Sequence, residues 1–196
     1  MAGKKVKKVG DLSGIVSPII AFTCILTAVT SSESFSWTNN ALSDLGVAKG
    51  VTAPLFNFGL VVSGVLAFAF VVLSLLPYFH DNLVGKVGAS FFAVSSLDLI
   101  LIGIFNENFR PTHYVVSVVF FVAIPISLLI LTAAFAIKHQ IKMASLSIVV
   151  AVLAAMSWIL NFSFGYVSGV AIPETISGAA AAIWIITLSY KVLKEQ

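Results

Sequence analysis

Charged residues are scarce in this chain. Of its 196 residues, 10% are Asp, Glu, Lys or Arg, whereas 59% are hydrophobic, and the mean hydropathy is +1.07. A soluble globular domain carries roughly 25% charged residues. The composition therefore excludes an ordinary soluble domain and indicates a chain whose apolar segments are buried in lipid.

Cysteine and histidine are also rare, with one Cys and three His. Cys24 has no intrachain partner and lies within an apolar run, which favours a packing role. Zinc normally needs three or four His, Cys or carboxylate ligands, and no phosphate-binding glycine loop or nucleophile elbow is present. We therefore expect no metal site and no cofactor. A carboxylate site for Ca²⁺ or Mg²⁺ stays open, although no loop signature predicts one.

Six long apolar runs dominate what is present. About 20 helical residues cross a ~30 Å hydrocarbon core, and a spanning backbone must satisfy its own hydrogen bonds. Continuous apolarity, without a two-residue alternation, favours helices over a barrel. We predict one all-α domain over residues 1–196, a polytopic membrane protein with a bundle of six transmembrane helices. The predicted spans are about 12–29, 53–76, 87–105, 113–137, 143–164 and 176–192.

Basic residues segregate to one side of the predicted bundle. With the N-terminus inside, nine lysines face the cytoplasm, and only Lys49 and Arg110 face outward. The positive-inside rule then predicts a multi-pass protein of the plasma (inner) membrane with both termini cytoplasmic. The segment "KKVKK" resembles the start of a secretory signal, which we expect to remain as the first span. The nine inner lysines are Lys4, Lys5, Lys7, Lys8, Lys86, Lys138, Lys142, Lys191 and Lys194.

The same distribution bears on partners. The basic residues lie at helix ends and form no stripe, so the net charge of +3 does not indicate a nucleic-acid partner. Membrane lipids are the expected partners. A homo-oligomer is compatible with a bundle of six short spans.

The outer loop 31–50 is the longest connection. Asn39 or Asn40 is a candidate cap for a short helix that runs through Leu45 and ends at Gly46. Such an element would lie at the membrane interface, folded over the outer mouth of the bundle. The residues expected at the lipid–water boundary are Trp37, Leu42 and Leu45.

Asp98 is the one acidic residue deep within a predicted span. It lies about seven residues below the outer end of the third span, or roughly 10 Å deep at 1.5 Å per residue. A carboxyl at that depth costs a few kcal/mol unless it faces a wet cavity, has a partner or stays protonated. Two interpretations stay open: a neutral Asp bonded to a neighbouring helix, or a residue that lines a polar pocket.

The octet "NENFRPTH" (106–113) links the third and fourth spans on the outer side. Its short length keeps Glu107 and His113 within reach of each other, and such a pair can hold one tautomer and pass a proton. An interfacial hydrogen bond or a capping role for His113 is the alternative. We expect Arg110 to pair with an outer carboxylate or to extend toward a lipid phosphate.

Further polar residues cluster in the outer third of the predicted bundle. A Ser–His–Asp arrangement of Ser43, His113 and either Asp44 or Asp98 is conceivable, although any serine-rich membrane protein permits a similar one. The catalytic candidates are His113, Glu107, Asp98, Asp44 and Ser43. The binding candidates are Arg110, Asn57, Asn161 and Glu174.

Three stretches carry a resemblance to a known family: "NALSDLG", "LFNFGLVVSG" and "GIFNENFRPTH". They resemble a prokaryotic six-span membrane protein family catalogued as domain of unknown function 998, from about the first span to the sixth. The family often has Pro where this chain has Asn106, and it brings no established activity. The resemblance marks Ser43, Asp44, Leu45, Gly46, Asn57, Gly64, Glu107 and His113.

The residues support several functions. The first is binding or handling of a lipid or other amphiphile through a polar outer-leaflet pocket. The second is a membrane-embedded hydrolase or transferase that uses the His/carboxylate pair. The third is a transporter in which Asp98 titrates, although few polar groups lie below it, and the fourth is a structural membrane subunit. The residues expected to line the pocket are Glu107, His113, Asp98 and Asp44.

Overall fold

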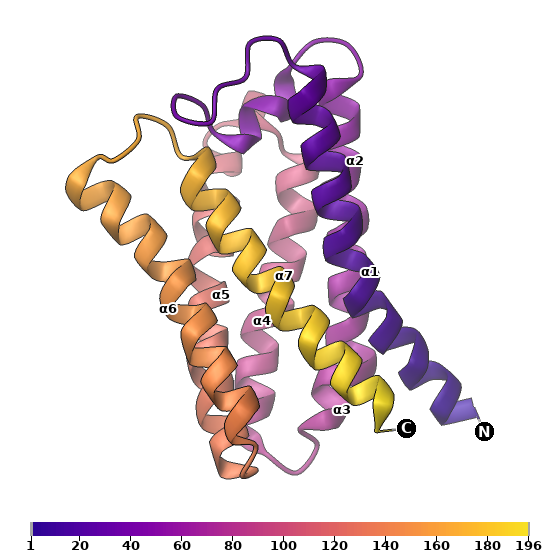
Figure 1. Ribbon diagram of the computed structural model, residues 1–196. Coiled ribbons are helices and arrows are strands. Elements are labelled where there is room, and N and C mark those ends of the chain that lie inside the picture. The colour runs from indigo at the N-terminus through magenta and orange to yellow at the C-terminus, as the bar shows by residue number, and fades with distance from the viewer. Residues whose placement is uncertain (1, 196) are drawn as a thin grey trace.

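The computed structural model is a bundle of long helices (Figure 1) that describes residues 2–195, with side chains from residue 5. Six of its helices are long and apolar enough to cross a membrane, and no residue in the described range is in a strand. The predicted all-α class with six spans is therefore confirmed. The long helices are α1 (Ala2–Ser31), α2 (Thr52–Phe70), α4 (Leu83–Ile104), α5 (Thr112–Ile137), α6 (Ile141–Phe164) and α7 (Ala171–Lys194).

The short elements interrupt or connect these helices. The second span continues from α2 through a π-helical turn, η2 (Val71–Leu75), into α3 (Leu76–Tyr78). Pro77 has no backbone N–H to donate within this stretch, and a π turn is one way a helix accommodates such a break. Two 3₁₀ helices, η1 (Leu42–Val47) and η3 (Glu107–Phe109), lie in loops at the end of the bundle opposite the termini, which we call the outer end (Figure 1).

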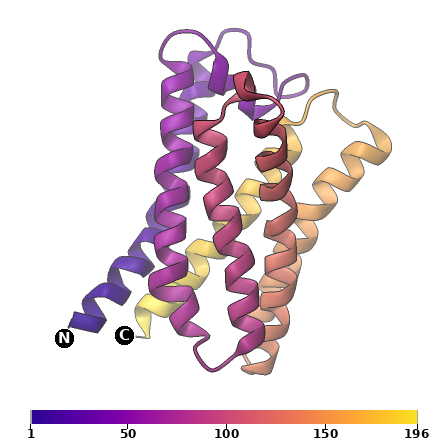
Figure 2. The same cartoon turned by 180° about the vertical axis from the view of Figure 1, so that it is seen from behind.

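The helices form a ring in which neighbours in sequence are neighbours in space. Helix α1 packs on α2, α2 on α4, α4 on α5, α5 on α6 and α6 on α7, and α7 closes the ring against α1. Figure 2 shows the α2, α4 and α5 side of this ring. Large apolar side chains such as Leu129, Val149 and Ile183 are exposed on its outside, as a lipid-facing surface requires.

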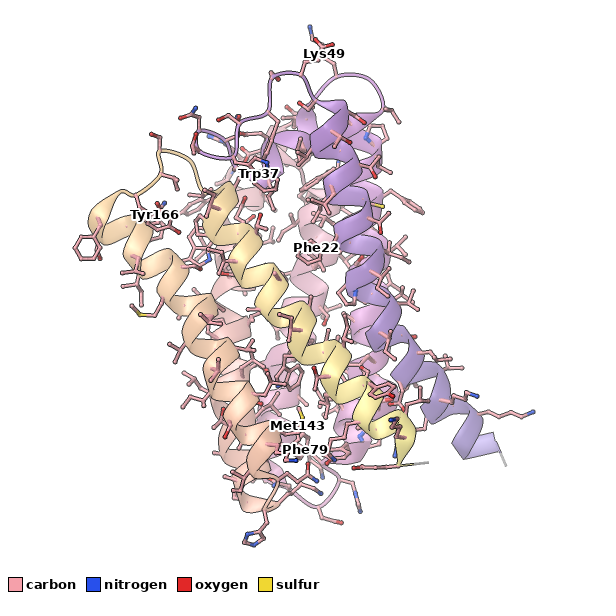
Figure 3. All side chains as sticks on the ribbon, in the orientation of Figure 1. Phe22, Trp37, Lys49, Phe79, Met143 and Tyr166 are labelled. Atoms are coloured by element: carbon pink, nitrogen blue, oxygen red, sulfur yellow. The ribbon has the colours of Figure 1, made fainter. Side chains whose placement is uncertain are left out.

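Both chain ends lie at one end of the bundle (Figure 1). Lys49, Trp37 and Tyr166 lie at the opposite end, away from Phe79 and Met143 (Figure 3). The helix bounds put eight of the nine predicted inner lysines at the same end as the termini. The side chain of the ninth, Lys4, lies outside the described residues. The lysines and the termini therefore share one side, as expected from the sequence.

Helix α1 begins well before the predicted start at residue 12. Lysine is a good helix former, so the helix continues through "KKVKK" beyond the apolar run.

Small residues then allow close packing between α2 and α4. A Cβ on Gly64 would lie 2.8 Å from the Ser96 carbonyl oxygen and 2.9 Å from the Ile100 nitrogen. Only a glycine permits this separation of the two helices.

The outer loop is inserted into the bundle and does not rest at its surface. Leu42 and Leu45 of η1 are buried in a hydrophobic cluster with Ile25 and Phe56, so their predicted place at the lipid–water boundary was wrong. Trp37 remains partly exposed. The apolar side chains of a short 3₁₀ helix lower their free energy more by closing the end of the core than by lying at the interface.

The expected cap of this element was also wrong. Ala41 holds the N-cap position, and Asp44 Oδ2 accepts hydrogen bonds from the Ala41 backbone N–H at 3.0 Å and from Asn40 Nδ2 at 2.8 Å. Gly46 lies inside η1 and does not end it. A carboxylate in the first turn thus satisfies the backbone N–H of the N-cap residue, as the acidic residue of a capping box does.

Candidate functional site

The loop between α4 and α5 folds around one carboxylate. Asn106 Oδ1 accepts a hydrogen bond from the Asn108 backbone N–H at 3.2 Å and so starts the short helix η3, of which Glu107 is the first residue. Asn106 therefore provides the turn that Pro is expected to provide in the family. We call the side chains that converge here the Glu107 cluster: Ser43, Glu107, Arg110, His113 and Ser117.

Both oxygens of Glu107 are engaged. Oε1 accepts a hydrogen bond from Ser43 Oγ at 2.9 Å, and Oε2 accepts from Arg110 Nε at 2.8 Å and from Arg110 Nη2. Partial burial raises the Glu107 pKa, but the hydrogen bonds from Arg110 and Ser43 and the charges of His113 and Arg110 outweigh it, so the net shift is downward. Glu107 is therefore an ionised acceptor at neutral pH.

His113 is buried beside Glu107. Its Nδ1 lies 2.7 Å from the Phe105 carbonyl oxygen, which can only accept, so Nδ1 carries a proton. Its Nε2 lies 3.4 Å from Glu107 Oε1 and 3.4 Å from Ser117 Oγ. The predicted proximity of Glu107 and His113 is present. The backbone carbonyl fixes the tautomer, so in the neutral ring Nε2 is unprotonated and can accept a proton.

A groove of about 830 Å³ runs from this cluster along α5 and α6. The outer end of α6 leans away from the other helices (Figures 1 and 2), and the groove residues from α5 and α6 line the space between these helices. Polar residues line its outer end, and apolar ones line the rest. The polar residues are Ser43, Glu107, Arg110, His113, Ser117 and Glu174, and the apolar ones include Phe121, Val122, Ile126, Leu129, Trp158 and Phe162.

A second, smaller cavity of about 140 Å³ lies inside the ring of helices. Side chains from α1, α2, α4, α5 and α7 line it, and most of them are apolar, such as Phe22, Phe56 and Phe92. The inner cavity and the groove share four lining residues: Ser43, Ser117, Phe121 and Glu174. These four residues form a common wall between the bundle interior and the groove.

Glu174 holds the outer loop against the start of α7. Its Oε2 accepts a hydrogen bond from the Leu42 backbone N–H at 2.5 Å. Its Oε1 has no hydrogen bond with any residue in the described part of the chain, and the side chain lines both cavities. One oxygen of Glu174 is thus structural, and the other is available to a ligand.

Three other candidates act as supports. The Asp44 carboxylate caps η1, as described above, and lines neither cavity. Asn57 Nδ2 donates to the Gly46 carbonyl at 2.9 Å and so links α2 to η1. Asn161 Oδ1 accepts from the Val167 backbone N–H at 3.2 Å, and its Nδ2 donates to the Gly169 carbonyl at 3.3 Å. These two amides shape the outer loops.

Asp98 stands apart from the Glu107 cluster. It is buried, with 7% of its surface exposed, and it lines neither cavity. Its Oδ2 has no hydrogen-bond partner among residues 2–195. The expected shared pocket therefore contains Glu107 and His113 but neither Asp98 nor Asp44, because the Asp44 carboxylate is used within η1 and Asp98 lines neither cavity.

The sequence analysis did not single out Ser117, Phe121 or Trp158. Ser117 and Phe121 follow His113 at successive intervals of four residues, so they lie on one face of α5. That spacing was the available signal. Trp158 packs on Phe121 with ring centroids 4.7 Å apart, and only the packing of α6 on α5 brings it to the groove. Within the described residues, no group of three His, Cys, Asp or Glu side chains is placed to hold a metal ion.

Comparison with known proteins agrees with the resemblance noted in the sequence. No curated protein and no solved structure matches the chain. The model of one family, described as "Protein of unknown function (DUF998)", matches residues 15–191, which include all the residues of the Glu107 cluster and both cavities. The chain therefore belongs to the DUF998 family.

Proposed function

We propose that the protein binds a membrane amphiphile, with its polar head at the Glu107 cluster and its apolar chain in the groove between α5 and α6. One observation carries this proposal. A single groove has charged and polar side chains at its outer end and only apolar ones, such as Val122 and Leu129, further along α5. This order of polarity is the order of polarity along an amphiphile.

The dimensions of the groove suit a lipid chain. From His113 to Leu129 the groove follows α5 over a helical rise of about 24 Å, which is more than half of a ~30 Å hydrocarbon core. Phe121, Trp158 and Phe162 form a continuous aromatic wall near its outer end. Aromatic rings are favoured at headgroup depth, so this wall supports a ligand head at the same level.

The proposal also assigns the Glu107 cluster to one side of the membrane. The lysine distribution supports termini in the cytoplasm and the Glu107 cluster on the outer face of the plasma membrane. The amphiphile would then enter from the outer leaflet, sideways between α5 and α6.

Native mass spectrometry of gently purified protein tests this function. Ala155 lines the groove, so Ala155→Phe should fill part of it and reduce the amount of co-purified lipid severalfold. Ala133 is exposed on α5 and does not line the groove, so Ala133→Phe is the matched control and should retain the lipid. Equal lipid content in the two variants would contradict the proposal.

Acyl transfer is a second candidate, favoured by the hydrogen bond between His113 Nδ1 and Phe105. This bond directs Nε2 toward Ser117 Oγ at 3.4 Å, where Nε2 would take the hydroxyl proton as Ser117 attacks the carbonyl carbon of an ester. The ester C–O bond would then break, and Nε2 would return the proton to the leaving alcohol. Water or a second alcohol would release the acyl group from Ser117 by the same steps in reverse. Glu107 would stabilise the resulting imidazolium. A dodecyl fluorophosphonate probe should then label Ser117, and His113→Gln should abolish labelling. No labelling of the folded wild-type protein would exclude this candidate.

A further inference from the structure

We propose that the groove selects an amphiphile whose head donates hydrogen bonds, through a hydroxyl or an amine, over one whose head is a phosphate. The inference rests on the proposed function, because it concerns the head of the same ligand. At the polar end of the groove the positively charged donor is already paired, whereas hydrogen-bond acceptors remain free.

Arg110, the cation of the groove, is already paired with Glu107. Arg110 is the one Lys or Arg among the groove residues, and its Nε and Nη2 both donate to Glu107 Oε2. The Glu107 carboxylate neutralises the guanidinium, so a phosphate could use only the remaining N–H groups and would be repelled by the adjacent carboxylate. Because charge-assisted hydrogen bonds are stronger than neutral ones and both N–H groups already donate to Oε2, Arg110 is a poor phosphate ligand while Glu107 is present.

The free capacity of the site consists of acceptors. Glu107 Oε1 accepts only the Ser43 hydroxyl. In its neutral form His113 Nε2 is an acceptor too, because the proton is on Nδ1. Both side chains line the groove. Their unused lone pairs match a ligand O–H or N–H and repel a phosphate oxygen.

Two buried polar atoms beside the groove indicate that it holds a polar group. His113 is only 5% exposed, yet its Nε2 has contacts no shorter than 3.4 Å. The adjoining inner cavity is lined by Ser63, whose buried hydroxyl has no partner among residues 2–195. Buried polar groups with long or missing hydrogen bonds are costly, so both observations point to a small polar group or water held in this pair of cavities.

The aromatic side chains of the groove also suit such a head. Tyr114, Phe121, Trp158 and Phe162 line the groove beside its polar end. An ammonium is attracted to aromatic faces, and a hydroxyl-bearing ring can stack on them, whereas an anion is repelled by their negative faces. The aromatic wall and the Glu107 carboxylate therefore both favour a head that carries an ammonium or a hydroxyl.

Competition among three amphiphiles of equal chain length tests the inference. The probe is a dansyl-labelled dodecyl chain, followed by tryptophan-to-dansyl energy transfer in nanodiscs, and the competitors are dodecylammonium, dodecyl glucoside and dodecyl phosphate. We expect the ammonium and glucoside to displace the probe at concentrations about tenfold or more below that of the phosphate, a ratio that one charge-assisted hydrogen bond accounts for. Phosphate that competes as well as either of the others would overturn the inference.

Reciprocal variants sharpen this test. Glu107→Gln releases Arg110, so dodecyl phosphate should compete better against this variant than against the wild type. Glu33 is an exposed carboxyl of the outer loop that lines neither cavity, and Glu33→Gln should leave the order of the three competitors unchanged. A Glu107→Gln variant that still disfavours phosphate as strongly would overturn the role assigned to Arg110.

Failure of the proposed function has a different signature. If Ala155→Phe leaves probe binding unchanged, the chain does not occupy the groove, and both proposals fall. If Ala155→Phe weakens the probe while phosphate competes best, the groove binds amphiphiles and only the head selectivity is wrong.

Discussion

Ser43 and Glu107 are separated by 64 positions in the sequence, yet the Ser43 hydroxyl donates to Glu107 Oε1 at 2.9 Å. This bond joins the first outer loop to the loop between α4 and α5. The Leu42 backbone N–H meanwhile donates to Glu174 of α7. Two carboxylates therefore fasten one short 3₁₀ helix to two distant parts of the bundle, and the groove opens beside them.

Removal of the Ser43 hydroxyl should loosen this connection. Hydrogen bonds to charged groups contribute about 1.5–3 kcal/mol, so we expect Ser43→Ala to lower the free energy of unfolding by up to that amount. The melting temperature in detergent is the readout. Ser34 is exposed and has no hydrogen bond through its hydroxyl to a described residue, so Ser34→Ala should leave the melting temperature unchanged.

Acid should remove the contribution of Glu107. The Glu107 pKa lies below its ordinary value of 4.5, because hydrogen bonds and nearby positive charge outweigh the effect of burial. A carboxyl with a lowered folded-state pKa stabilises the fold above its unfolded-state pKa, and this stabilisation is lost as the pH falls through the folded-state value. The melting temperature of Glu107→Gln should therefore lie below that of the wild type at neutral pH.

The difference between the two proteins should shrink below about pH 4.5, where protonation makes the wild-type side chain resemble the variant. A melting-temperature difference that is independent of pH between 3 and 7 would show that the Glu107 charge does not stabilise the fold. Carboxyls remote from Glu107 titrate equally in both proteins, so the comparison removes their contribution.

The spans were predictable because a single strong requirement determines them. Apolar runs of sufficient length must be helical in lipid, and the predicted ends of α5 and α6 agree with the structure to within two residues. The outer loop was less predictable. Whether Leu42 and Leu45 lie at an interface or fill the end of the core depends on the space left by Ile25 and Phe56, which the local sequence does not describe.

Some features of the candidate site were likewise predictable from the local sequence, and others were not. The proximity of Glu107 and His113 follows from a loop too short to separate them. The hydrogen bond from Leu42 to Glu174 and the packing of Trp158 on Phe121 depend on how distant helices associate. Asp98 shows the limit of composition alone, because the direction of its side chain depends on the rotation of α4 within the bundle.

Cysteine accessibility tests the proposed side of the membrane. Cys24 is the only cysteine, so a Cys24→Ala background permits single-cysteine variants. We expect a membrane-impermeant maleimide to label Lys49→Cys in intact cells and Lys142→Cys only after permeabilisation, because the positive-inside rule puts Lys142 in the cytoplasm. The reverse pattern would invert the topology and move the groove entrance to the inner leaflet.

Close packing of α2 against α4 gives a stability prediction with a built-in control. A Cβ on Gly64 would approach backbone atoms of Ser96 and Ile100 within 3 Å, and backbone cannot yield locally, so Gly64→Ala should cost about 1–3 kcal/mol. A Cβ on Gly178 would meet only Phe22, at 3.6 Å. Gly178→Ala should therefore be tolerated, and the melting temperatures of the two variants decide the matter.

Asp98 provides the sharpest test of whether a buried carboxyl without a visible partner has a structural role. Its Oδ2 has no hydrogen bond with a residue in the described range, and an isolated carboxyl in an apolar bundle is costly. Asp98→Asn keeps the size and removes the ionisable group, so we expect an unchanged or higher melting temperature at pH 7, with a gain of up to about 1 kcal/mol. Asp81→Asn, in an exposed loop, is the matched control and should change little. A clear loss of stability in Asp98→Asn alone would mean that the carboxyl makes a stabilising contact in the membrane, and the interpretation of Asp98 as part of a polar pocket would then regain support.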